Sequence, residues 1–150
     1  MDATNNPFNS IPDVKIPSAA YRPYVLHGNI LHISGQLPVK DGKAVWVGQV
    51  PDTVSVVDAQ NAARLCTENV LAWLKHACEG DFGRVDRCLR IAGYVATGAE
   101  FKDAPIVVNA ASEMLTSILG ARGEHARIAL GVASLPFGAP VEIEAQFSLR

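Results

Sequence analysis

An arginine stands near the start of an apolar, strand-like segment close to the C-terminus. The segment HARIALGVASLP runs from His125 to Pro136, and Arg127 is its one permanent charge. In one interpretation the side chain extends along the surface and keeps its charge in water. In the other it lines a partly dry cleft, where its planar guanidinium can bind a carboxylate with two hydrogen bonds. A desolvated guanidinium is costly unless it is paired, so the cleft requires an anionic partner, either Glu142 or the carboxylate of a ligand.

The last strand-like segment carries two carboxylates in an alternating pattern. Five apolar residues alternate with four polar ones: Val141, Ile143, Ala145, Phe147 and Leu149 against Glu142, Glu144, Gln146 and Ser148. This pattern predicts a strand with one face in the core and one polar face. A solvated polar face is the simpler interpretation, but the apolar run RIALGV indicates that the second face of the sheet is partly covered. An oligomer joined through sheet faces or edges would cover it.

Cysteine and histidine offer little further chemistry. Cys66, Cys78 and Cys88 form no CxxC pair, and no histidine lies at zinc-ligand spacing from them. We expect free, buried thiols in a reducing compartment. The four histidines are scattered, and we expect none of them to bind metal or to assist a nucleophile: His27, His32, His76 and His125. No metal site and no cofactor are predicted.

The composition narrows the class of protein. The chain of 150 residues is 49% hydrophobic and 19% charged, which favours one compact domain. A formal net charge of −2 does not favour binding to the nucleic-acid backbone. The sequence also lacks the basic amphipathic helix that is typical of proteins binding a membrane surface. The N-terminal MDATNNPFNS lacks the pattern of a signal peptide, and no run is expected to be long enough to span a membrane. A cytoplasmic protein is expected.

Periodicity predicts the elements that must position these residues. Residues 1–20, rich in Pro and Asn, are expected to form an extended arm, and residues 21–150 a single domain. The predicted elements are a hairpin turning at Gly28-Asn29, a second turn at Asp41-Gly42 followed by a strand over 43–48, helices from about Ser55 to Gly80 and from Ala104 to Leu119, and strands over 87–97, 126–135 and 140–149. This order predicts a two-layer α+β fold, with two helices packed on one face of a mixed sheet.

Three blocks together are characteristic of a known family. They are NILHISGQLPV, VNAASEMLTSILG and HARIALGVASLPFGAPVEIEA. In this order and spacing they resemble the Rid family, the YjgF-type reactive intermediate deaminases also called endoribonuclease L-PSP, from about Tyr21 to Phe147. The resemblance implies a chorismate-mutase-like fold, a homotrimer around a central barrel and ligand clefts between subunits. It also implies hydrolysis of 2-imino acids, formed from enamines such as 2-aminoacrylate, to 2-keto acids and ammonia without metal or cofactor.

The resemblance also suggests roles for individual residues. Arg127 falls on the family's anchor for the substrate carboxylate, and Glu142 on the carboxylate that positions or activates water. The substrate-binding positions fall on Tyr24, Ser34, Gly35, Asn109 and Ala129. Many characterised members carry cysteine at the last of these, where backbone contacts help to place ligand and water. The alanine, and the flanking segments GEHAR and GAEFKDAPIVVN, indicate a divergent branch. Glu144 is left with a structural role.

Three functions are considered. The first is a deaminase of imino or enamino acids, since Arg127 can orient a carboxylate and Glu142 can accept a proton from water. The second is a non-catalytic protein that binds a keto acid or similar small carboxylate in the same cleft. This alternative is retained because Ala129 replaces the cysteine of many characterised members. The third, an endoribonuclease, is the least favoured, because the chain has neither a basic patch with interleaved aromatic residues nor a histidine pair.

Overall fold

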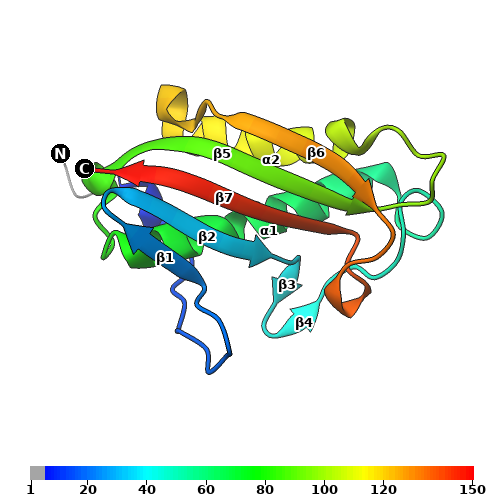
Figure 1. Cartoon of the computed structure of the whole chain (residues 1–150), viewed down its shortest axis with the longest axis horizontal. Helices are drawn as coiled ribbons and strands as arrows, with labels where there is room; N and C mark the ends of the chain where they lie inside the picture. The colour runs from blue at the N-terminus through cyan, green and yellow to red at the C-terminus, as the bar shows by residue number, and fades with distance from the viewer. Residues whose placement is uncertain (1–5) are drawn as a thin grey trace.

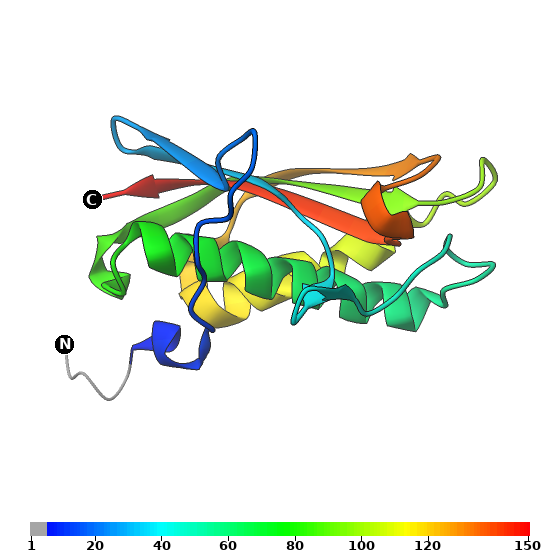
Figure 2. The same ribbon diagram turned by 90° about the horizontal axis from the view of Figure 1, so that it is seen from below.

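A computed structural model describes residues 6–150 as one five-stranded sheet with both long helices on one of its faces (Figures 1 and 2). The strands are β1 (Tyr24–His27), β2 (Ile30–Gln36), β5 (Val85–Ala96), β6 (Ala126–Val132) and β7 (Val141–Leu149), and their order across the sheet is β1-β2-β7-β5-β6. Strands β5 and β6 pair in parallel, and the other neighbours in this sheet are antiparallel. The predicted two-layer α+β fold is confirmed.

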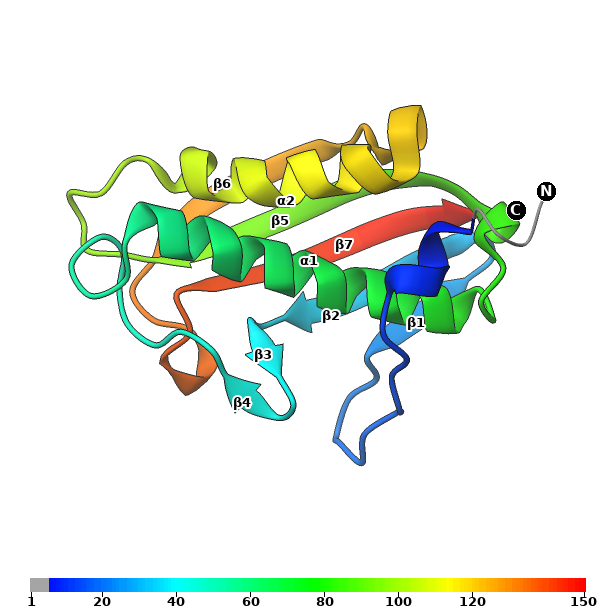
Figure 3. The same cartoon turned by 180° about the vertical axis from the view of Figure 1, so that it is seen from behind.

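The two helices divide the covered face of the sheet between them. Helix α1 (Val56–Ala77) contacts β2 and β7, and α2 (Ala104–Leu119) contacts β5 and β6 (Figure 3). The Ser55 hydroxyl caps α1 by accepting a hydrogen bond from the Asp58 N–H group. Beyond the helix, Gly80 adopts a left-handed φ of 79°, so the predicted stop is confirmed. Helix α2 has the bounds predicted from its periodicity.

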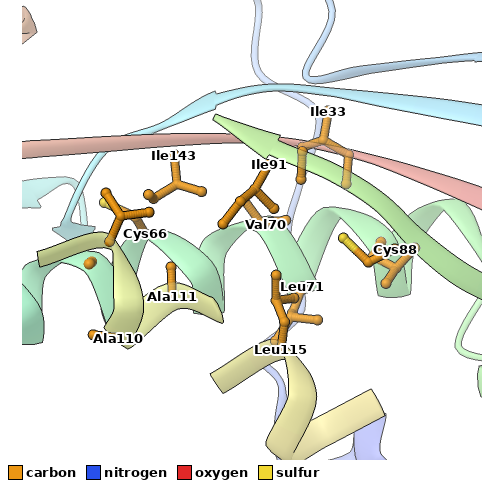
Figure 4. Close-up of a cluster of buried hydrophobic side chains, with 14 of the residues drawn as sticks. Ile33, Cys66, Val70, Leu71, Cys88, Ile91, Ala110, Ala111, Leu115 and Ile143 are labelled. Carbon is orange, nitrogen blue, oxygen red and sulfur yellow. The ribbon is translucent and has the colours of Figure 1, made fainter. Parts of the chain in front are cut away.

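Apolar side chains fill the space between the layers. Ile33, Ile91 and Ile143 point from the sheet toward Val70 of α1 (Figure 4). The three cysteines are free and buried, as expected. Burial raises the pKa of the Cys78 thiol to about 11 and that of Cys88 to about 12, and it also raises the pKa of Cys66. These thiols therefore remain protonated near neutral pH and serve as small apolar groups.

The N-terminal arm is more structured than predicted. Residues Pro7–Ser10 form a 3₁₀ turn that buries Phe8, whose ring meets Phe82 edge to face at 5.2 Å between centroids. Lys75 of α1 holds the next segment, since its Nζ donates to the Ile11 carbonyl and pairs with Asp13 at 2.8 Å. Burial of Phe8 thus docks part of an arm that the Pro-rich sequence suggested was loosely held. Residues 1–5 of the predicted arm lie outside the described residues.

Two other expectations were wrong. The strand predicted over 43–48 is limited to β4 (Lys43–Ala44), which pairs with β3 (Val39–Lys40), because the chain then bends until the Gly48 N–H group bonds to the Gly138 carbonyl. The segment Ala104–Gly123, which contains α2, is also long and apolar enough to cross a membrane, with a mean hydropathy of 1.3. Its helix α2 packs on β5, β6 and α1, and 39% of the apolar stretch is buried within the described chain.

Candidate active site

Arg127 lies on the edge strand β6 and is held by helix α2. It is paired with Ile91 of β5, which points into the core, so its side chain leaves the sheet on the helix side. Its Nη2 donates to Asn109 Oδ1 at 2.7 Å and to the Pro105 carbonyl at 3.4 Å, and its Nη1 donates to Ser112 Oγ at 3.2 Å. The guanidinium therefore has a defined position although the side chain is exposed.

Helical spacing explains why α2 offers three acceptors on one side. Pro105, Asn109 and Ser112 are separated by four and three residues, which brings them onto one face of a helix. That face meets the helix side of β6, which Arg127 shares with Ala129 two residues further on. We call Arg127, Asn109 and Ala129 the arginine half-site. Ala129 is half-buried against the core, so it offers a ligand mainly its backbone.

The charge of Arg127 is not neutralised within the described chain. All three of its acceptors are uncharged, and none of the ion pairs formed by residues 6–150 involves it. Arginine remains protonated, and it has five N–H donors in a fixed fork. The three observed bonds leave its Nε–H and second Nη1–H groups for a ligand. A positioned, exposed cation with spare donors is suited to bind an anion such as a carboxylate.

Glu142 belongs to a second cluster, on the opposite face of the sheet. Its neighbours Val141 and Ile143 on β7 point into the core, so the Glu142 side chain points away from the helices. It lies against Gly35 of β2, where a Cβ would come within 2.9 Å of its Cδ and closer still to Oε1. Gly35 therefore leaves the space that the carboxylate occupies.

Ser34 lies beside Gly35 where β2 loses its regular pairing. The register with β7 shifts between Ile33 and Gln36, and the residues after Ile33 extend past β1, which pairs only as far as that residue. The Ser34 hydroxyl donates to the Arg22 carbonyl at 2.7 Å, so one of its functions is to hold the incoming chain. We call Ser34, Gly35 and Glu142 the glutamate half-site.

Burial perturbs the titration of Glu142. Partial burial raises the pKa of its carboxyl group, and the nearby charge of Glu144 raises it further. Glu144 itself accepts a hydrogen bond from the Tyr94 hydroxyl at 3.4 Å and lies 3.7 Å from Arg90. Glu142 has no such cationic neighbour among the ion pairs of residues 6–150. A carboxylate with a raised pKa is a stronger base toward water than an ordinary one.

Tyr24 does not join either half-site. It pairs with the buried Ile33, so its ring lies on the helix side, near Trp73 and His76 of α1. Its hydroxyl is hydrogen-bonded to His76 Nδ1 at 3.1 Å. Within one chain, Tyr24 is therefore separated by the sheet from Glu142 and by three strands from Arg127.

Two polar residues beside Arg127 were not predicted to take part in the site. The sequence pattern gave His125 no role and did not single out Ser112, yet the Ser112 Oγ and His125 Nε2 atoms lie 3.0 Å apart. The available signals were weak: Ser112 follows Asn109 by three residues on a helix, and His125 precedes Arg127 by two in an extended segment. Both spacings place side chains on a shared face, but only the packing of α2 on β6 brings the two faces together.

One chain does not bring the predicted catalytic pair together. Arg127 leaves the helix side of the sheet at its β6 edge, whereas Glu142 leaves the opposite face beside β2. The expectation that Glu142 could neutralise Arg127 within the chain is therefore wrong. The two half-sites lie on opposite faces of the sheet, one on the edge strand β6 and the other on β2 and the central strand β7, so a cleft containing both would need more than one copy.

Comparison with known proteins defines the family. The model of the family described as "YjgF/chorismate mutase-like, putative endoribonuclease" matches residues 7–142. The chain belongs to the YjgF/Rid family. Protein TCP17 of Trypanosoma cruzi is 39% identical to this chain over 141 residues, which are 93% of this chain and 88% of that protein.

Two solved structures are also similar to this YjgF/Rid protein. Atu1372 of Agrobacterium tumefaciens, a protein of unknown function, is 43% identical with a TM-score of 0.87, covering 91% of this chain and 87% of its own. A protein of Shewanella oneidensis described as a "putative endoribonuclease" is 28% identical with a TM-score of 0.89, covering 97% of this chain and 100% of its own. The predicted family and its chorismate-mutase-like fold are thus confirmed.

Proposed function

We propose that this YjgF/Rid protein hydrolyses 2-imino acids and their enamine tautomers to 2-keto acids and ammonia. The observation that carries the proposal is the guanidinium of Arg127, which is positioned by three neutral acceptors and keeps free N–H donors without an anionic partner among residues 6–150. Imino acids carry the carboxylate that such a group binds. In the deaminase activity that the sequence motifs imply for the family, the substrate is bound through this carboxylate.

The two half-sites provide complementary steps of the reaction. Arg127 binds the substrate carboxylate and thereby orients the imine carbon for attack. Glu142 accepts a proton from water as its oxygen adds to that carbon, while the imine nitrogen, already protonated, becomes an amino group. Glu142 then returns this proton to the nitrogen of the carbinolamine, which leaves as ammonia while the hydroxyl proton is released to water and the 2-keto acid forms. General-base assistance of this kind typically contributes about 10²–10⁴-fold, and its efficiency benefits from the raised pKa of Glu142.

We further propose that the active assembly is a homotrimer, with the arginine half-site of one copy facing the glutamate half-site of the next. Two different patches of one chain that bind each other make head-to-tail contacts, and such contacts form a closed ring when the rotation between neighbouring copies closes. Val25, Ile128 and Leu130 support an interface, because these apolar side chains are 38–55% exposed on the face without helices. The three free thiols are consistent with a cytoplasmic location.

The test generates imines in place with an amino-acid oxidase and follows their trapping by semicarbazide for a panel of amino acids. We expect the wild-type protein to suppress trapping and Arg127→Ala to abolish the effect. Arg64→Ala is the matched control, since Arg64 is an exposed arginine whose side chain bonds to Asn61 of its own helix, away from both half-sites. Suppression that survives in Arg127→Ala would contradict the carboxylate anchor.

A second outcome would favour the alternative function. If no substrate is hydrolysed faster, but 2-ketobutyrate binds to wild type and not to Arg127→Ala, the site is a binding site for small carboxylates. Ala129 is the specific observation behind this candidate, because many catalytic members carry a thiol at that position. Size-exclusion chromatography with light scattering tests the trimer separately.

A further inference from the structure

We propose that Ser112 and His125 are positioning residues, which fix the guanidinium of Arg127 for binding a substrate carboxylate. This inference rests on the proposed function for its consequence in catalysis. Ser112 lies on α2 and His125 immediately precedes β6, so the pair spans the junction from which Arg127 projects. Neither residue needs to touch the substrate for this role.

The hydrogen bonds of His125 define which ring nitrogen carries the proton. Its Nδ1 is bonded to the Gly123 carbonyl, and a carbonyl oxygen can only accept. Nδ1 must therefore be the protonated nitrogen, and in the neutral ring Nε2 is an acceptor. The Ser112 hydroxyl, 3.0 Å from Nε2, then donates a hydrogen bond to this nitrogen.

The orientation of Ser112 in turn directs Arg127. Because the hydroxyl proton points toward His125, the lone pairs of Ser112 Oγ are available to the Arg127 Nη1–H group at 3.2 Å. The result is a chain of hydrogen bonds with one direction, from Arg127 through Ser112 and His125 to the Gly123 carbonyl. Together with Asn109 on Nη2, Ser112 holds both terminal nitrogens of the guanidinium. This leaves less side-chain entropy to be lost when a ligand binds.

Close packing at Gly123 makes the end of this chain rigid. A Cβ at this position would come within 2.7 Å of the Leu115 carbonyl carbon and within 2.9 Å of the Thr116 Cα. Gly123 therefore lets the segment before β6 lie directly on the backbone of α2. The carbonyl that orients His125 is fixed by main-chain contact and not by a flexible side chain.

The test separates the hydroxyl of Ser112 from its size. Ser112→Thr keeps the hydroxyl, and Ser112→Val replaces it with a side chain that has the same shape as threonine. We expect Ser112→Val to weaken binding of 2-ketobutyrate, measured by calorimetry, about tenfold, the loss typical of one hydrogen bond to a charged group. The KM for imine should rise by the same factor while kcat changes by less than about twofold, because the lost contact serves ground state and transition state alike.

Two comparisons serve as controls for this result. Ser112→Thr should stay within about twofold of wild type, since it keeps the donor and acceptor. Thr116→Val removes a hydroxyl one turn further along α2, which bonds to carbonyls of its own helix, and should change neither parameter. Equal losses in Ser112→Thr and Ser112→Val would overturn the proposal, because they would indicate a steric cause.

A measurement on the free protein keeps the inference testable if the proposed function fails. Hindered rotation of the guanidinium should give resolved Nη signals for Arg127 in nitrogen NMR spectra of wild type and Ser112→Thr. Ser112→Val and His125→Phe should show averaged signals, and His125→Gln, which can still accept from Ser112, should recover part of the splitting. Unchanged signals in Ser112→Val would overturn the positioning role, whereas a restrained Arg127 without any effect on keto acids would overturn the proposed function alone.

Discussion

Gly35→Ala should displace the carboxylate of Glu142 while leaving that residue chemically unchanged. The Cβ of the new alanine would lie within 2.9 Å of the Glu142 Cδ and closer to Oε1, well inside ordinary van der Waals contact. The obstacle is the end of a side chain, so the carboxylate can retreat, by roughly 1 Å. Displacements of this size at a reacting group can cost about 10²-fold in rate.

The expected effect is therefore a fall of about 100-fold in kcat/KM for imine hydrolysis, comparable to the lower range for losing a general base. Affinity for 2-ketobutyrate should fall far less than the rate, because the new Cβ meets Glu142 and leaves the carboxylate anchor Arg127 unchanged. Urea unfolding should show little loss of stability, since the backbone at Gly35 is not in the left-handed region. Gly98→Ala is the matched control, because a Cβ added at Gly98 would have no atom within 4 Å.

Comparison with Glu142→Gln determines how the result is interpreted. If Gly35→Ala retains full activity while Glu142→Gln loses it, the carboxylate tolerates displacement and the reasoning from tight placement is refuted. If both variants are fully active, Glu142 takes no part in the reaction. If Gly35→Ala loses activity and also fails to fold, the loss of activity is no longer evidence that displacing Glu142 lowers the rate.

Three further predictions concern stability. Phe8→Ala should lower the free energy of unfolding by about 3–5 kcal/mol in urea titrations, because Phe8 is 1% exposed in an aromatic contact; a loss below about 1 kcal/mol would show that the arm is not docked. Gly93→Ala should cost about 1–3 kcal/mol, since its Cβ would meet the Val108 methyl groups, and Val108→Ala in the same chain should recover part of the loss; additive losses would contradict this contact. Glu142→Gln should raise the melting temperature at pH 7, because the raised pKa of Glu142 means that its ionised form destabilises the folded state. That difference should vanish as the pH falls below the ordinary glutamate pKa of about 4.3, and a pH-independent difference would refute the electrostatic cause.

Local patterns were sufficient for most of the elements. Periods of three and four residues predicted both long helices, including both ends of α2, and alternation predicted β7 with its buried and polar faces. These elements are predictable because each buries one continuous stripe of its own side chains. The prediction was wrong for the segment over 43–48, where a hydrogen bond to Gly138, far along the chain, ends the strand. The docking of Phe8 was not predicted either, because its ring meets Phe82 only in the folded molecule.

The sequence alone determined the fold class, the family and the residue types available for chemistry at the site. The order and spacing of the motifs predicted Arg127, Glu142 and Gly35 as site residues, because such a pattern can be recognised in the sequence itself. Only the tertiary structure decided that Arg127 and Glu142 leave opposite faces of the sheet, since which face a side chain takes depends on strand pairing and on which side the helices pack. Likewise, only the packing of α2 on β6 brought Ser112 and His125 to Arg127, because contacts between distant segments depend on how whole elements pack and not on the pattern within any one of them.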